Sequence, residues 1–320
     1  MDKNPDLLDK ILELRDLFNS TIVYKQTVWN NKNVGNWDKI CSGLDNIEDT
    51  QLAISEYTRL EKFSRLALYG LLQSLVVQQD SLKSIEESLG IKVPNLKTSF
   101  PKLKEIRDIR NETTGHPTET KLDKNSNFES GTVSYTTIAR IDSIEILDYG
   151  VWSSQGFIHK SINLRDIIKI QQELLILEID RVIKKIKTDE MNHKQKFRDK
   201  SLSSLLSQTQ YHIQKLWSFE REREYSQINF KFLQKVYAKF KEEIQKRYMI
   251  NKVDEHGVQI PGLIEEFKKI DILLPRIEKM ILLEDGIDTF DLDVYVESLS
   301  HSFDQLRIMA KEIDTEFSQQ

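Results

Sequence analysis

The apolar residues of the chain recur mostly three or four positions apart, which is the spacing of helices with one buried face. This pattern predicts a first helix over Pro5–Asn31, one or two helices between Ile47 and Gly90, and a helix over Phe100–Thr114. The most hydrophobic stretch is Leu66–Val77. Its breadth predicts a central bundle helix, or a helix that also meets a second subunit.

Two tryptophans, Trp29 and Trp37, frame a break at Asn30–Asn36 that is rich in asparagine. Paired tryptophans can stack on a nucleic-acid base, but beside a helix end they more often fill a core. We therefore expect a packing role for them.

The spacing changes to alternation of β-branched and polar residues after a polar loop at Thr118–Gly131. Strands are expected at Thr132–Ile141, Ser143–Tyr149 and Gln155–Ile162, with breaks at Asp148–Gly150 and at Ser153–Ser154. This predicts a small antiparallel β-hairpin or three-stranded meander inserted in a helical protein. So small a sheet is not stable alone in water, so it must pack on the bundle or on a partner.

Helical spacing returns over Leu164–Lys187, and the lysine-rich stretch Lys184–Lys200 either links two domains or continues as a solvated helix. Four further helices are predicted near Leu202–Glu224, Tyr225–Tyr248, Gly262–Ile272 and Asp291–Phe317. A break is expected at Pro275. The sequence thus predicts a mainly α protein, with a helical bundle and its β insertion in residues 1–187 and a C-terminal helical accessory domain in residues 188–320.

Cysteine usage and motifs exclude several classes of protein. Cys41 is the only cysteine, so neither an intrachain disulfide nor a cysteine-rich metal cluster is possible, and a reducing cytoplasm is the expected setting. The sequence has no glycine-rich phosphate loop, no His-Glu-x-x-His, no Gly-x-Ser-x-Gly and no EF-hand loop, and we expect no metal or cofactor. The N-terminus lacks the apolar core of a signal peptide and no apolar run is as long as a membrane span, so we expect no membrane association.

Charge is distributed unevenly although the net charge is only −5. Residues 181–250 carry 17 positive and 8 negative side chains, whereas residues 251–320 carry 7 positive and 16 negative. The two blocks are solvated helix faces that attract each other, or the basic block is a surface that attracts phosphate. The basic residues in question are Lys184, Lys185, Lys194, Lys196, Arg198, Lys200, Arg221 and Arg223.

The candidate chemistry lies at the end of the Phe100–Thr114 helix. Ser99 or Thr98 is its expected cap, Pro101 suits its first turn, and Gly115 and Pro117 end it.

One arginine and one histidine stand out at this helix end. Leu103, Ile106 and Arg110 share one helix face, so Arg110 is expected to face a neighbouring helix and to need a partner there. A glycine turn lets the chain fold back and bring His116 over the helix end, close to Arg110. Alternatively, Arg110 covers the terminal carbonyls of its own helix, where a cation is favoured, and His116 is an ordinary loop residue.

The segment from Arg110 to His116, with sequence RNETTGH, resembles the motif of HEPN domains. These are all-helical modules in which an arginine, a polar residue, a few variable positions and a histidine lie near the end of a helix. The resemblance covers roughly residues 1–187 and implies a metal-independent ribonuclease site built across a homodimer. It implies that His116 moves a proton around the ribose 2′-OH, that Arg110 stabilises the phosphate charge, and that Asn111 holds the pair in register by hydrogen bonding.

The resemblance also implies RNA as the substrate and a role as a toxin or antiviral defence effector, with a possible antitoxin or defence-system partner protein. Some toxin members carry a tyrosine shortly after the histidine, which a partner antitoxin modifies. Here Pro117 and Thr118 follow His116, which speaks against that mode of silencing.

A different class of function stays open, because the same bundle could be a non-catalytic scaffold or adaptor that binds protein or nucleotide. Arg110 held in a core ion pair would favour the scaffold. The motif in a dimer cleft would favour the nuclease.

Overall fold

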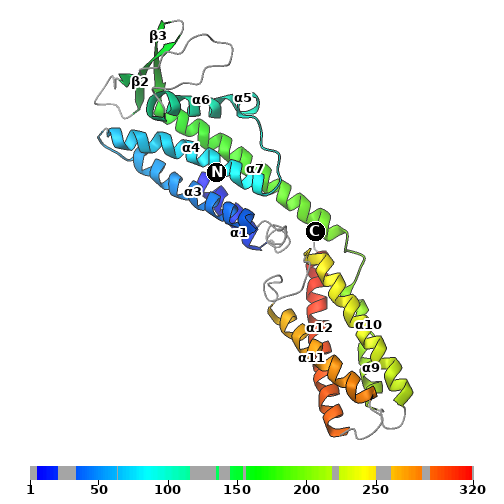
Figure 1. Ribbon diagram of the computed structural model, residues 1–320. Coiled ribbons are helices and arrows are strands. Elements are labelled where there is room, and N and C mark those ends of the chain that lie inside the picture. Colours follow the sequence, from blue (N-terminus) through cyan, green and yellow to red (C-terminus); the bar gives the residue numbers. More distant parts are fainter. Residues whose placement is uncertain are drawn as a thin grey trace, which may run out of the picture. The chain divides into compact units, whose positions relative to one another are not determined.

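A computed structural model gives the fold of the chain (Figure 1). It describes residues 6–20, 34–62, 64–115, 135–136, 145–153, 156–217, 223–249, 261–282 and 289–318. More than half of all 320 residues lie in helices, which confirms the mainly α class. The described chain divides into two compact units between Lys185 and Ile186, inside one long helix, and each unit is described by itself.

The first unit is a helical bundle with one small sheet. Its helical elements are α1 (Leu7–Ser20), α3 (Val34–Thr58), α4 (Arg65–Ser88), α5 (Leu96–Ser99), α6 (Pro101–Arg110), the π-helical segment η1 (Asn111–Gly115) and the first part of α7 (Leu164–Gln195). Helices α3 and α4 lie side by side (Figure 1). The core beneath the sheet joins residues from α3, α4, α6, β2 and α7, among them Ile54, Leu72, Leu75, Ile106, Leu147 and Ile168.

The start of the second helical stretch needs correction. The expected first helix is present as α1 over Leu7–Ser20, and its remaining residues 21–31 lie outside the described residues. The next helix begins at Val34 and not at Ile47. Trp37 lies in this helix, where its ring meets the ring of Phe18 edge-on at 6.1 Å between centroids. Packing of this kind outweighs the weak helix propensity of Asn36 and Gly35.

The predicted small antiparallel sheet is confirmed. β1 (Tyr135–Thr136), β2 (Ile146–Ser153) and β3 (Gly156–Asn163) are paired in that order, and Ile146 lies opposite Asn163. The expected break at Asp148–Gly150 is wrong, because these residues lie within β2. Leu147 and Tyr149 on one face of β2 are buried in the bundle core, which provides the packing that so small a sheet needs.

The lysine-rich stretch after Lys184 continues α7 as far as Gln195. In the second unit this helix is followed by α8 (Leu202–Leu205), α9 (Thr209–Leu216), α10 (Arg223–Tyr248), α11 (Pro261–Leu282) and α12 (Thr289–Ser318). The predicted helix at Leu202–Glu224 is, over its described residues 202–217, two short helices with a turn between them, and Glu224 belongs to α10.

Pro275 does not break its helix, contrary to the prediction, because α11 runs through it to Leu282. A proline inside a helix costs about 3 kcal/mol. Leu274, Ile277 and Ile281 are buried around it, and each such side chain contributes roughly 1.5–3 kcal/mol. Burial therefore outweighs the cost of the proline.

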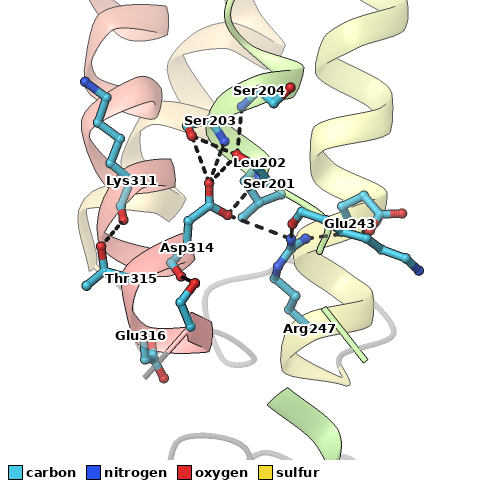
Figure 2. A network of polar contacts seen from close by, with 12 residues as sticks. Ser201, Leu202, Ser203, Ser204, Glu243, Arg247, Lys311, Asp314, Thr315 and Glu316 are labelled. Atoms are coloured by element: carbon cyan, nitrogen blue, oxygen red, sulfur yellow. Dashed lines mark hydrogen bonds and ion pairs between the residues drawn. The ribbon is translucent and has the colours of Figure 1, made fainter. Parts of the chain in front are cut away.

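A polar network near the end of α12 joins three helices of the second unit (Figure 2). The Asp314 carboxylate accepts hydrogen bonds from the backbone N–H of Leu202 at 2.8 Å and of Ser203 at 2.9 Å, so it caps α8 from another helix. Burial alone would raise the pKa of Asp314, but these N–H donors and the hydroxyls of Ser201 and Ser203 outweigh it and hold the pKa below its ordinary value.

Candidate functional site

The motif helix α6 begins directly after the short helix α5. Thr98 and Ser99, the expected caps, lie inside α5, so that prediction is wrong. Phe100 takes the cap position and makes no side-chain cap hydrogen bond. Pro101 occupies the first turn, as predicted, where its missing N–H leaves no helix bond unmade.

The buried stripe of α6 consists of Leu103, Ile106 and Ile109. Arg110, expected to continue that stripe, is only half-buried. Ile109 takes the core position because a helix turns by about 100° per residue. Arg110 therefore lies at the edge of the stripe, where it still reaches the neighbouring helix α4.

The guanidinium of Arg110 is held by two neutral side chains. Its Nε and one terminal nitrogen donate to the Gln73 amide oxygen at 3.1 and 2.8 Å, and the other terminal nitrogen donates to the Asn111 amide oxygen at 3.0 Å. In the described part of the chain, no carboxylate lies within ion-pair distance of Arg110. Its position is fixed while its charge is not neutralised.

Threonines, not Arg110, cover the terminal carbonyls of this helix. The Thr113 hydroxyl donates to the carbonyl of Ile109 at 2.6 Å, and the Thr114 hydroxyl donates to the carbonyl of Arg110 at 3.2 Å. The segment Asn111–Gly115 continues the helix with the wider π-helical turn, a feature that is frequent at functional sites. The alternative in which Arg110 itself caps the helix does not match these contacts.

Glu112 ties the motif to the sheet. Its carboxylate accepts a hydrogen bond from the Tyr149 hydroxyl at 2.8 Å and pairs with the Lys160 ammonium at 2.7 Å. Burial, followed by the nearby Glu112 carboxylate, raises the pKa of Tyr149, so its hydroxyl stays a donor. The ammonium of Lys160 also lies over the Tyr149 ring, 5.6 Å from its centroid.

His116 lies outside the described residues, so its pairing with Arg110 stays a prediction. His159 is exposed on β3. His193 is buried in the second unit, with Nε2 2.5 Å from the carbonyl oxygen of Arg247, and His212 contacts Asn229 at 2.7 Å. Where residues are described, no three His, Cys, Asp or Glu side chains are grouped as metal ligands.

An exposed apolar stripe on α4 adjoins the arginine. Leu66 is 80% exposed and Tyr69 is 48% exposed, and the exposed Gly70 and Gln73 follow on the same helix face. A methyl group at Gly70 would meet no atom within 4 Å. Since Gln73 binds Arg110, this α4 stripe of Leu66, Tyr69, Gly70 and Gln73 is continuous with the motif.

The basic residues of the 181–250 block are divided between the two units. Lys184 and Lys185 belong to the first unit and the others to the second, and Arg221 lies outside the described residues. Lys194 pairs with Glu190 at 2.9 Å, and the Nε of Arg223 donates to a backbone carbonyl. The phosphate-binding surface stays a prediction.

Searches against protein-family models, curated proteins and solved structures found no match. Among the described helices, none is both long enough and apolar enough to cross a membrane.

Proposed function

We propose that the chain is a HEPN-type endoribonuclease that cuts RNA without a metal ion and acts as a homodimer. The observation that carries this proposal is the positive charge of Arg110, held at a helix end by the neutral oxygens of Gln73 and Asn111. A fixed cation without a carboxylate partner is suited to stabilise the negative charge that grows on a phosphate during cleavage. An arginine that only stabilises the fold is more commonly paired with a carboxylate.

The reaction is a transfer within the RNA backbone. The ribose 2′-oxygen attacks the adjacent phosphorus, the bond from phosphorus to the 5′-oxygen breaks, and the products are a 2′,3′-cyclic phosphate and a 5′-hydroxyl. His116 of one copy takes the proton from the 2′-OH, and the same histidine of the second copy gives a proton to the leaving oxygen. Arg110 stabilises the charged phosphate, and Asn111 orients the guanidinium.

The α4 stripe supports a dimer next to this site. A two-fold symmetric interface uses the same patch on both copies, so Leu66 and Tyr69 would meet their counterparts and bring two motifs together. Large exposed apolar side chains of this kind mark interaction surfaces.

The alternative function, a scaffold that binds a protein, uses the same stripe without the chemistry. The Leu66→Glu substitution distinguishes the nuclease from the scaffold. In the nuclease it converts the dimer to a monomer in sedimentation and lowers RNA cleavage in chelator at least about tenfold, because half a site is incomplete. Leu177→Glu, which places the same charge on an exposed leucine of α7, should change neither.

Cleavage by a Leu66→Glu monomer at the wild-type rate would contradict the dimeric site. Wild-type protein that cuts no RNA, with or without metal, would favour the scaffold.

A further inference from the structure

The first unit holds a cavity of about 310 Å³ away from the motif arginine. Helices α4, α6 and α7 and the chain leading into α5 enclose it, and its apolar wall consists of Leu82, Val93, Leu96, Phe100, Leu103 and Leu175. This volume is at the small end of ligand pockets, large enough for a molecule with one or two rings. Such pockets typically combine apolar walls with a few placed polar groups.

Two buried carboxylates form part of the cavity wall. Glu86 of α4 is 3% exposed and Glu178 of α7 is 8% exposed. Both bind one guanidinium: Arg181 donates to Glu178 at 2.9 Å and is also paired with Glu86. Both carboxylates line the cavity, whereas Arg181 is not among its described lining residues.

The remaining charges around the cavity are paired one to one. Arg107 of α6 binds Asp80 at 2.8 Å, and Lys83 lies 3.6 Å from Glu87. The acid pair alone has two carboxylates for one cation. An uncompensated buried charge is costly, so this cluster needs a second positive charge.

When no ligand is bound, a proton on Glu86 supplies that charge. Burial raises the pKa of Glu86 to about 7, with Arg181 opposing the shift and Glu178 adding to it. A carboxyl group whose ordinary pKa is 4.5 thus holds a proton near neutral pH. A ligand cation at the same place would compensate the second carboxylate without the proton.

We propose that this cavity binds a small, mostly apolar molecule with a cationic nitrogen head group, an aromatic amidine or amine, whose charge pairs with the buried carboxylates of Glu86 and Glu178. The ring packs against the apolar wall, and the N–H groups donate to the carboxylate oxygens. The released proton passes to solvent. This site does not depend on the ribonuclease proposal, since it uses neither Arg110 nor His116.

Competition with the proton sets the sign of the pH dependence. Below pH 7 the ligand must displace a proton, so affinity rises about tenfold per pH unit as pH increases, and above pH 7 it levels off. The other charged groups at the cavity are Asp80, Lys83 and Arg107, and each is held in an ion pair.

The probe is benzamidine, titrated into the full chain by calorimetry at pH 6 and pH 8, in buffers of different ionisation enthalpy. One molecule should bind per chain, roughly tenfold tighter at pH 8, with close to one proton released at pH 6. Benzamide has the same ring without the charge and should bind at least about tenfold more weakly. Benzoate should not bind.

Glu86→Gln should weaken benzamidine binding at least about tenfold and remove its pH dependence. Glu173→Gln, on an exposed position of α7, is the matched control and should change nothing. Because Glu86 is buried, a second variant guards against misfolding: Val93→Trp fills the cavity from its half-buried rim and should abolish binding without lowering Tm.

No saturable binding of benzamidine up to about 10 mM at pH 8 would overturn the proposal. Equal binding of benzamide or benzoate would overturn it too, and so would undiminished binding to Val93→Trp.

Discussion

Two arginines near helix ends, Arg110 in the first unit and Arg247 in the second, are held in opposite ways. Arg247 is 0% exposed and lies against the rings of Phe197 and Phe317, 5.1 and 5.9 Å from their centroids. Its nitrogens are 3.6 and 3.9 Å from the carboxylates of Glu243 and Asp314 (Figure 2). Arg110 is half-buried and bound by neutral amides. Arg247 is enclosed and neutralised, whereas the charge of Arg110 is left available.

The comparison contrasts a structural arginine with one for which we propose a role in catalysis. A buried cation with aromatic and carboxylate neighbours stabilises the fold around it, and its loss is felt by the whole unit. A positioned surface cation contributes little to stability, so its placement by Gln73 and Asn111 calls for another explanation. The distinction would fail if replacing Arg110 destabilised the fold strongly and replacing Arg247 did not.

The largest stability effect is expected for Arg247→Ala. It removes a buried cation, opens a cavity beside two rings and takes the arginine from Glu243 and Asp314, so the free energy of unfolding should fall by about 3–5 kcal/mol. Urea unfolding of the full chain measures this. Arg247→Met, which keeps the packing, should cost less. A loss below about 1 kcal/mol for Arg247→Ala would mean that the arginine is not structural.

Glu112→Ala should have the next largest effect, because it leaves the buried Tyr149 hydroxyl and the Lys160 ammonium without their acceptor. We expect a loss of about 1–3 kcal/mol and, since the motif is no longer tied to the sheet, slower RNA cleavage. Glu105→Ala, an exposed position on the same helix, is the control. Equal Tm values for the two variants would argue against the anchoring role.

Asp314→Asn tests the network around Arg247 through acid denaturation. The folded pKa of Asp314 is below its ordinary value of 3.8, so its contribution is fully present above that pH and is lost as the pH falls toward the folded pKa. The variant should lose about 0.5–2 kcal/mol at pH 7 and show a shallower decline below pH 4. Parallel pH profiles for wild type and variant would contradict this assignment.

Arg110→Ala should have the smallest effect on stability, below about 1 kcal/mol, because the hydrogen bonds of Arg110 are solvent-exposed and their acceptors are neutral amides. Thermal unfolding measures it. A loss as large as that of Arg247→Ala would place Arg110 with the structural arginines and remove the basis of the comparison.

Patterns local in sequence predicted much of this fold. Helical spacing identified most helices, and β-branched alternation located the sheet. Local signals misled at Pro275, where burial outweighs the proline, and at Ser99, which belongs to a preceding helix turn.

Contacts between residues that are far apart in the sequence could not be predicted from the spacing of apolar residues. Gln73 and Arg110 are 37 positions apart, and Glu86 and Arg181 are 95 apart. Glutamine on a helix surface or glutamate within an apolar run has many ordinary uses. Only the packing of α4 against α6 and α7 gives Gln73 and Glu86 their partners.

The central claim is that Arg110 serves RNA cleavage and not folding, and cleavage rates in chelator test it most directly. We expect Arg110→Ala and His116→Ala each to lower the rate about 10²–10⁴-fold with nearly unchanged Tm, and the double variant to be little slower than either, because both side chains act in one transition state. Lys102→Ala, an exposed cation on the same helix, should cut RNA at the wild-type rate. Cleavage that survives Arg110→Ala or His116→Ala, or that requires added metal, would contradict the account.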